Sequence, residues 1–148
     1  MSKVIICNVD NGKTLKVDTS YPLSKDFKVR EFRSRECEVV LYSQRHVDEL
    51  QAIRDYYDRS LSLTNGHRTI SHNIDVGGSD DSDHMHGKAS DIYMVGISAS
   101  DLKIVASKIC GWYSSIITYK NTNHVHVSSG VDHQRLYHNG SDYVKVYF

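Results

Sequence analysis

Residues 46–60, HVDELQAIRDYYDRS, carry the first clear helical pattern of this chain. Its apolar side chains recur at helical spacing with charged residues between them: Val47, Leu50, Ile53, Tyr56 and Tyr57. That spacing predicts an amphipathic helix with one side against a core. A second helix is predicted to begin after Ser98, because Asp101 completes a capping-box-like pair with that serine. Gly111 can end it.

Short strand patterns lie on both sides of these helices. Residues 4–7 and 14–17 flank Asp10-Asn11-Gly12, and Asn-Gly is typical of a tight two-residue hairpin turn. Further strands are predicted over 38–42, 61–64, 87–95, 116–118, 124–128 and 143–147, the last after Asn139-Gly140. We expect Trp112 in the core and three apolar residues, Phe27, Val29 and Phe32, to pin segment 24–35 to it. The pattern favours the α+β class, a small, mostly antiparallel sheet with two main helices.

Length and composition restrict the class of protein. The 148 residues suit a single domain, 1–148, and 39% apolar with 24% charged residues is typical of a globular protein. Eighteen basic residues balance eighteen acidic ones, which argues against nucleic acid as a partner. We expect a monomer without membrane insertion, because no run approaches the ~20 apolar residues of a membrane span. The N-terminus lacks the apolar run of a signal peptide, so synthesis in the cytoplasm is expected.

Two histidine clusters carry the chemistry. In the predicted strand Asn123-His124-Val125-His126-Val127, alternation places both histidines on one face and both valines toward the core. His84 precedes another predicted strand, and Asp91 lies within it. His84, Asp91 and either His124 or His126 supply two nitrogens and one oxygen. That set suits a catalytic Zn²⁺ ion that keeps an open position for water, on the open face of the sheet.

Tyr93 alternates with Asp91 and is expected in the core, although the alternation would also let it line the cleft. The Gly/Ser/Asp-rich stretch 69–88 is predicted to be a long loop, and a loop of this length in a compact domain is usually functional or disordered. Gly87 is small enough to let that loop fold back over its own strand.

These motifs resemble those of the M15 zinc peptidases. Ser82-x-His84-x-x-Gly87-x-Ala89-x-Asp91, followed by His124-x-His126, is similar to the signature of the D-Ala-D-Ala carboxypeptidases and L-Ala-D-Glu endopeptidases that cut peptidoglycan stem peptides. Segment 66–69, GHRT, resembles the "GYRT" turn of the phage-type subgroup, and the likeness covers about 23–129. The pattern at 124–128 also resembles the zinc core of the hedgehog signalling domain.

The resemblance implies a role for each matching residue. His84, Asp91 and His126 would be the zinc ligands, although an alignment counted from Tyr119 would choose His124 as the third. Arg68 would bind the substrate and stabilise its carbonyl or carboxylate, for which a planar guanidinium is suited. Ser82 would contact the substrate or the residues around the metal.

Asn123 stands where many members of the family place an acidic general base, and an amide accepts no proton at neutral pH. His124 is then the expected proton acceptor, because imidazole titrates near neutral pH.

Two functions follow. The first is a zinc-dependent peptidase that hydrolyses peptidoglycan stem peptides with metal-activated water and acts on the cell wall after release, as a phage lysin does. The alternative is a catalytically weak, zinc-stabilised module that binds cell-wall peptide or a protein partner. Asn123, and Lys120 at a second position where some members carry an acid, motivate that alternative.

Overall fold

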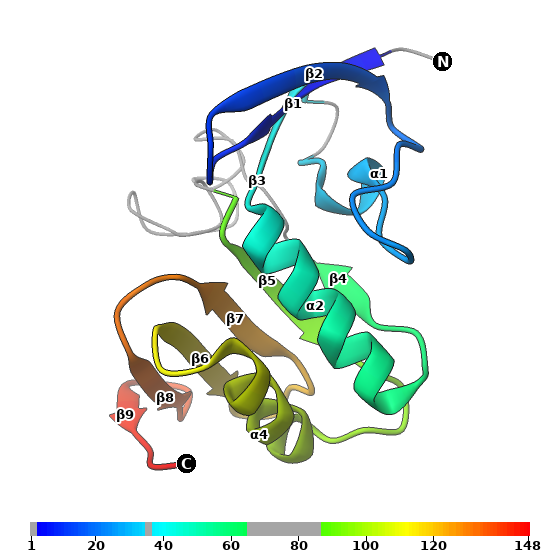
Figure 1. Ribbon diagram of the computed structural model, residues 1–148. Helices are drawn as coiled ribbons and strands as arrows, with labels where there is room; N and C mark the ends of the chain where they lie inside the picture. The colour runs from blue at the N-terminus through cyan, green and yellow to red at the C-terminus, as the bar shows by residue number, and fades with distance from the viewer. Residues whose placement is uncertain (1–2, 35–36, 65–86) are drawn as a thin grey trace.

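The computed structural model of the chain describes residues 3–34, 37–64 and 87–148 (Figure 1). In chain order its helices and strands are β1 Lys3–Asn8, β2 Lys13–Asp18, α1 Val29–Phe32, β3 Val39–Tyr42, α2 Gln44–Tyr57, β4 Ser62–Thr64, β5 Ala89–Tyr93, α4 Ala99–Cys110, β6 Ser114–Tyr119, β7 Val125–Ser129, β8 Gln134–His138 and β9 Tyr143–Lys145. The α+β class and the two main helices, α2 and α4, are confirmed.

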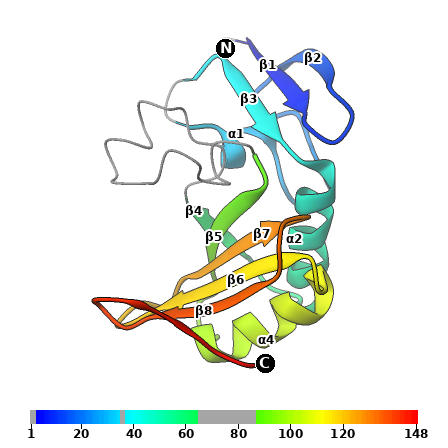
Figure 2. The same cartoon turned by 90° about the vertical axis from the view of Figure 1, so that its left-hand side faces the viewer.

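The strands form two sheets rather than one. A six-stranded sheet has the order β4-β5-β7-β6-β8-β9, and a three-stranded sheet has the order β2-β1-β3. The pairs β1–β3 and β6–β8 are parallel, and the other pairs are antiparallel, so the sheets are mostly antiparallel as predicted. Helices α2 and α4 lie on the same face of the six-stranded sheet (Figure 2). We call the opposite face of this sheet the open face.

The main core lies between the helices and the covered face of the six-stranded sheet. Its largest fully buried side chains include Leu50, Ile53, Ile92, Met94, Leu102 and Ile116. Near the smaller sheet, Phe27, Val29 and Phe32 are also buried, as predicted, and the rings of Phe27 and Phe32 meet edge to face with centroids 6.1 Å apart.

The predicted N-terminal hairpin is confirmed, but its turn is longer than the expected two residues. Asn8 pairs with Lys13, so residues 9–12 form a four-residue turn. The Asn8 side chain accepts a hydrogen bond from the backbone N–H of Asp10 (3.1 Å), which begins the turn before Asn-Gly is reached. Of the two residues expected at the centre of the turn, only Gly12 has a positive φ, +73°.

A serine side chain at the N-terminal end of each main helix explains why that helix begins where it does. The Ser43 hydroxyl accepts a hydrogen bond from the His46 N–H (3.2 Å), so α2 begins two residues before the predicted start. The Ser98 hydroxyl accepts from the Asp101 N–H (3.1 Å), which confirms the predicted cap of α4. Tyr56 is 67% exposed, because it falls outside the buried stripe of α2, and its predicted place in the apolar stripe is wrong.

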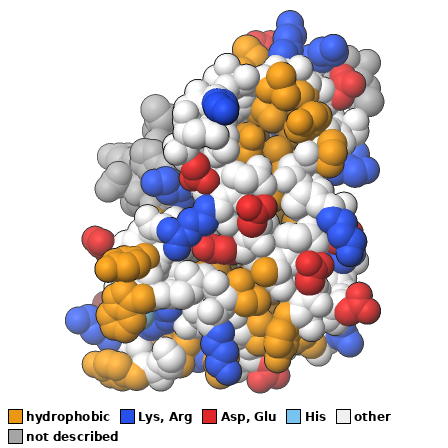
Figure 3. All heavy atoms as spheres, viewed as in Figure 1, with side chains coloured by type: hydrophobic (Ala, Val, Ile, Leu, Met, Phe, Trp, Pro, Cys, Tyr) orange, Lys and Arg blue, Asp and Glu red, His pale blue; other side chains and the backbone are white. Residues whose placement is uncertain are grey.

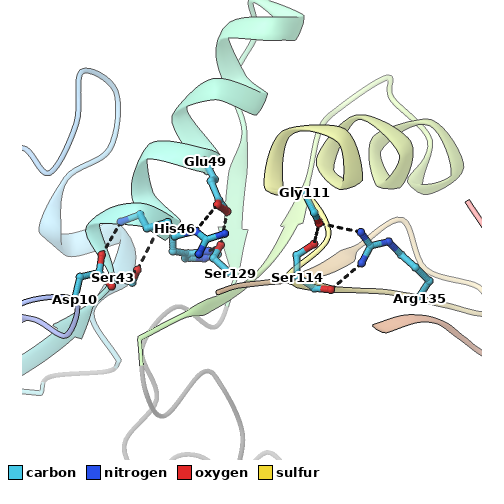
Figure 4. A network of polar contacts seen from close by, with 9 residues as sticks. Asp10, Ser43, His46, Glu49, Gly111, Ser114, Ser129 and Arg135 are labelled. Carbon is cyan, nitrogen blue, oxygen red and sulfur yellow. Dashed lines mark hydrogen bonds and ion pairs between the residues drawn. The ribbon is translucent and has the colours of Figure 1, made fainter. Parts of the chain in front are cut away.

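The end of α4 is held by an arginine. Gly111 follows the helix with φ +77°, and the buried Arg135 guanidinium donates hydrogen bonds to the carbonyl oxygens of Gly111 (3.1 Å) and Ser114 (2.7 Å) (Figure 4). Trp112 is 66% exposed, so its predicted place in the core is wrong. It stacks on His133 at the surface instead, with ring centroids 3.7 Å apart.

Gly87 joins the two sheets. Its carbonyl oxygen accepts a hydrogen bond from the Ser43 N–H (3.0 Å), and a Cβ atom at this position would lie 2.5 Å from the carbonyl oxygen of Leu41 in β3. Its φ is +72°, which also favours glycine. The absence of a side chain therefore brings the start of β5 against the end of β3. The rest of the predicted long loop, from 69 to 86, lies outside the described residues.

Acidic and basic side chains alternate over the described part of the face that Figure 3 shows, and neither sign dominates it. Within residues 3–34, 37–64 and 87–148, we find no helix with the length and apolar character that a membrane crossing requires.

Candidate metal centre

Strands β5 and β7 bring two of the predicted ligands together. The strands are antiparallel, and Asp91 pairs directly with His126 while Ile92 pairs with Val125. Val125 and Val127 are fully buried on the helix side, so the alternation predicted for this strand is confirmed. Asp91 and His126 therefore lie on the open face, with side-chain exposures of 20% and 13%.

The donor atoms of this pair fit a shared ion. His126 Nδ1 lies 3.2 Å from Asp91 Oδ1. With metal–ligand bonds of ~2.0–2.2 Å, two ligands of one tetrahedral Zn²⁺ ion stand roughly 3.3 Å apart. An imidazole nitrogen and a carboxylate oxygen are both ligands that zinc accepts. His126 Nε2 lies 2.8 Å from the Ser128 hydroxyl, which fixes the orientation of the ring.

The neighbours of the pair on the open face differ on its two sides. On β4, Thr64 pairs with Asp91, and its hydroxyl donates to the Asp91 carbonyl oxygen (3.2 Å). On β6, Ile117 pairs with His126 and is 9% exposed. The apolar Ile117 side chain therefore lies next to the Asp91–His126 pair on the β6 side, where it restricts the access of water.

His124 lies two residues before His126, beside a different partner. Its ring meets the Tyr93 ring edge to face, with centroids 5.1 Å apart. Tyr93 is half-buried on the open face, so it lines this face and does not lie in the core. The structure therefore brings Asp91 to His126 and Tyr93 to His124.

Asn123 faces the start of α4. Its side-chain oxygen accepts a hydrogen bond from the Ala99 N–H (3.1 Å), and its side-chain nitrogen donates to the Ile97 carbonyl oxygen (3.4 Å). The amide thus connects the segment before β7 to the N-terminal end of the helix. This contact gives Asn123 a structural function.

Three predicted site residues, Arg68, Ser82 and His84, lie outside the described residues. In the described part of the chain, no three side chains of His, Cys, Asp or Glu are close enough to hold an ion together. The choice of His84 as a ligand therefore stays a prediction, as do the functions of Arg68 and Ser82.

A buried histidine lies behind the pair, and the sequence pattern did not reveal it. His46, 1% exposed, lies in the first turn of α2 (Figure 4). Its Nδ1 is 2.7 Å from the Ser129 hydroxyl, and its Nε2 is 2.9 Å from the Ser90 hydroxyl. The Ser129 hydroxyl donates to Glu49 (2.7 Å), so it accepts from His46 Nδ1–H.

This network reaches both strands of the candidate site from the helix side. Ser90 precedes Asp91 on β5, and Ser129 follows Ser128 on β7. One signal in the sequence was available, because small hydroxyl residues occupy positions that alternation assigns to the core. Buried hydroxyl groups need a hydrogen-bonding partner, and His46 is that partner for Ser90 and Ser129.

The structure also has a cavity of about 870 Å³ at the C-terminal end of α4, away from this pair. Trp112, His133, Arg135 and Tyr147 are among the residues that line it, and neither Asp91 nor His126 is.

Comparison with known proteins gives one positive result. The family model described as Peptidase M15 matches residues 24–128, which include Asp91 and the His124-x-His126 motif. No curated protein matches the chain significantly.

Proposed function

The chain belongs to the M15 family of peptidases, and we propose on this basis that it is a zinc-dependent peptidase of peptidoglycan stem peptides. The observation that carries the proposal is the contact between Asp91 and His126 on the open face. His84 is the proposed third ligand, and its position in the sequence before β5 supports that choice.

The residues of the site have distinct proposed functions. When bound, zinc supplies a Lewis acid that activates water and polarises a carbonyl. Asp91 and His126 would hold the ion, and Ser128 would keep the His126 ring in place. The Arg68 guanidinium would bind the substrate and stabilise negative charge on its carbonyl oxygen, and Ser82 would contact the same substrate.

His124 is the proposed proton acceptor. It lies on the same side of the sheet as His126, and an imidazole can take a proton near neutral pH. Asn123 cannot take this proton. It would instead hold the segment that carries His124, through its hydrogen bond to the start of α4.

Asp91→Asn tests the metal site, because it removes the charge and keeps the shape of the side chain. We expect this variant to lose zinc after dialysis and to hydrolyse purified muropeptides at least about a hundredfold more slowly than the wild type, because even the outer partners of metal ligands contribute about 10–100-fold. Zinc per chain is measured by atomic emission, and products are measured by mass spectrometry. Asp132→Asn, at an exposed position, is the matched control and should behave as the wild type does. Equal zinc content and equal hydrolysis in Asp91→Asn would refute the proposal.

The same two measurements distinguish the histidines. His126→Ala should lose zinc as Asp91→Asn does. His124→Ala should keep zinc and hydrolyse more slowly, because it removes the proton acceptor only. Loss of zinc in His124→Ala with full retention in His126→Ala would transfer the ligand assignment to His124.

One observation favours a second function. The side chain at the acid position of the family, Asn123, is already hydrogen-bonded to α4, and a catalytically weak binding module needs no base there. The wild-type protein with measured zinc occupancy decides between the two functions. Release of D-Ala or of a cut stem peptide excludes the weak module, whereas wall binding without any release supports it.

A further inference from the structure

A row of aromatic rings crosses the open face beside the candidate metal pair. The register of the sheet joins its members: Tyr119 pairs with His138, and His138 pairs with Tyr143. Thr118 and Ile92 both pair with Val125, the first residue of β7. Continued by one position, this register puts His124 between Tyr119 and Tyr93. We call this set the aromatic row; its members are Tyr93, His124, Tyr119, His138 and Tyr143.

Ring contacts support the two parts of the row, on either side of the step from His124 to Tyr119, independently of the register. Centroids are 5.1 Å apart for Tyr93 and His124, 6.1 Å for Tyr119 and His138, and 4.6 Å for His138 and Tyr143. All five side chains are at least partly exposed, and Tyr143 is 57% exposed. Strands β5, β7, β6 and β8 lie side by side in this order (Figure 2).

The row has the position and length of a binding surface for an extended ligand. It spans five neighbouring strands at roughly 4.8 Å each, so its ends lie roughly 19 Å apart. Tyr93 and His124 are each two residues from Asp91 and His126, and hence about 7 Å from the metal pair along the strands. A ligand bound along the row would therefore pass directly beside the pair.

The chemistry of the row favours a sugar chain over a peptide. Its side chains are phenols and imidazoles, which combine flat apolar faces with hydrogen-bonding groups, and it has no carboxylate or ammonium group. A sugar ring offers the matching surfaces, apolar C–H faces and hydroxyl groups. An extended peptide gains most from pairing with a sheet edge, and this row crosses a sheet face at right angles to the strands.

We propose that the aromatic row binds the glycan strand from which the stem peptide projects, so that peptides attached to glycan are the preferred substrates. The preference for glycan-linked substrates rests on the proposed function, whereas the binding of glycan by the aromatic row does not. Tyr143, which is farthest from the metal pair, would act as a specificity residue without contact with the reacting atoms.

Tyr143→Ala tests this proposal, with Tyr147→Ala as the matched control. Tyr147 is another C-terminal tyrosine, 92% exposed and outside the row. Two substrates are compared, a stem peptide attached to its disaccharide chain and the same peptide without sugar. We expect Tyr143→Ala to raise KM for the glycan-linked substrate about three- to tenfold, with kcat and the cleavage of free peptide unchanged. Tyr147→Ala should change neither, and Tyr143→Phe should restore most of the binding.

Binding without catalysis separates the two proposals. Sedimentation with purified, peptide-free glycan strands is measured for the wild type, Tyr143→Ala and Tyr147→Ala. Weaker binding of Tyr143→Ala alone supports the row even if no peptide is ever cut, in which case only the proposed function fails. Equal binding by all three proteins, or equal cleavage of free and glycan-linked peptide by the wild type, would overturn the inference.

Discussion

At the scale of single residues, His46 is a fully buried polar side chain that depends on distant partners. Both of its ring nitrogens are within hydrogen-bond distance of buried serine hydroxyls, and Ser129 passes the contact on to Glu49. Loss of the imidazole would leave the Ser90 hydroxyl without this partner in a region from which water is excluded, and Ser129 would keep only its hydrogen bond to Glu49.

We predict that His46→Leu lowers the free energy of unfolding by about 2–3 kcal/mol, because unpaired buried polar groups cost about 1–3 kcal/mol. Urea denaturation followed by circular dichroism measures this value. Asp48→Ala, an exposed change on the same helix, should stay within about 0.5 kcal/mol of the wild type. A His46→Leu protein as stable as the Asp48→Ala protein would show that the network contributes nothing to stability.

The sequence was sufficient for some residues of the site and insufficient for others. Alternation alone placed Asp91 and His126 on strands and Val125 toward the core, because a strand has a period of two. The contacts of His46 could not be predicted, because its serine partners are 44 and 83 positions away in the sequence. Helical spacing gives the face of α2 on which a residue lies, and it carries no information about partners so distant.

At the scale of elements, the joint between β3 and β5 depends on Gly87. Two separate restrictions act there: the positive φ, and the Leu41 carbonyl oxygen, which would lie only 2.5 Å from a Cβ atom. Gly12 shares only the first, since it has φ +73° and open space around it. These two glycines therefore separate the cost of backbone strain from the cost of steric overlap.

We predict that Gly87→Ala lowers the free energy of unfolding by about 3 kcal/mol, and that Gly12→Ala lowers it by about 1 kcal/mol. The smaller effect is the cost of a left-handed conformation for a residue with a Cβ atom, and overlap with backbone adds the rest. Thermal and urea denaturation measure both. Similar losses in the two variants would mean that β3 moves aside without cost.

The elements themselves were predictable where local signals determine them. Ser98 and Gly111 mark the ends of α4 in sequence and in structure. Strand order was not predictable, because β5 pairs with β7 across the intervening α4 and β6, and such pairing depends on packing between distant segments. The division into two sheets was not predictable for the same reason.

At the scale of the whole molecule, the burial of two ionisable side chains, Tyr42 and Cys110, makes the free energy of unfolding depend on pH in the alkaline range. Burial raises the pKa of the Tyr42 phenol above its ordinary value of 10.0, with smaller contributions from Tyr21, Cys7 and Asp10. Burial also raises the pKa of the Cys110 thiol, next to Glu49. Both groups lose their protons more easily in the unfolded chain. Their contribution to stability is therefore complete below the unfolded pKa values and is lost as pH rises through the folded ones.

We predict that the free energy of unfolding of the wild type falls between pH 8 and pH 10.5, and that it falls less for Tyr42→Phe. Urea denaturation at the two pH values measures the difference. Tyr147→Phe, at a 92% exposed position, should follow the wild type. An identical pH dependence in Tyr42→Phe would exclude the Tyr42 phenol as a source of the effect.

The direct pairing of Asp91 with His126 has one more consequence. If β7 slipped by a single position against β5, Val125 or Val127 would emerge into solvent and an imidazole would be forced among the aliphatic groups beneath the helices. A shifted register is therefore unfavourable for two reasons, because it exposes valine side chains to water and buries a histidine among apolar groups. The residues proposed to capture the ion help to enforce the alignment on which its capture depends.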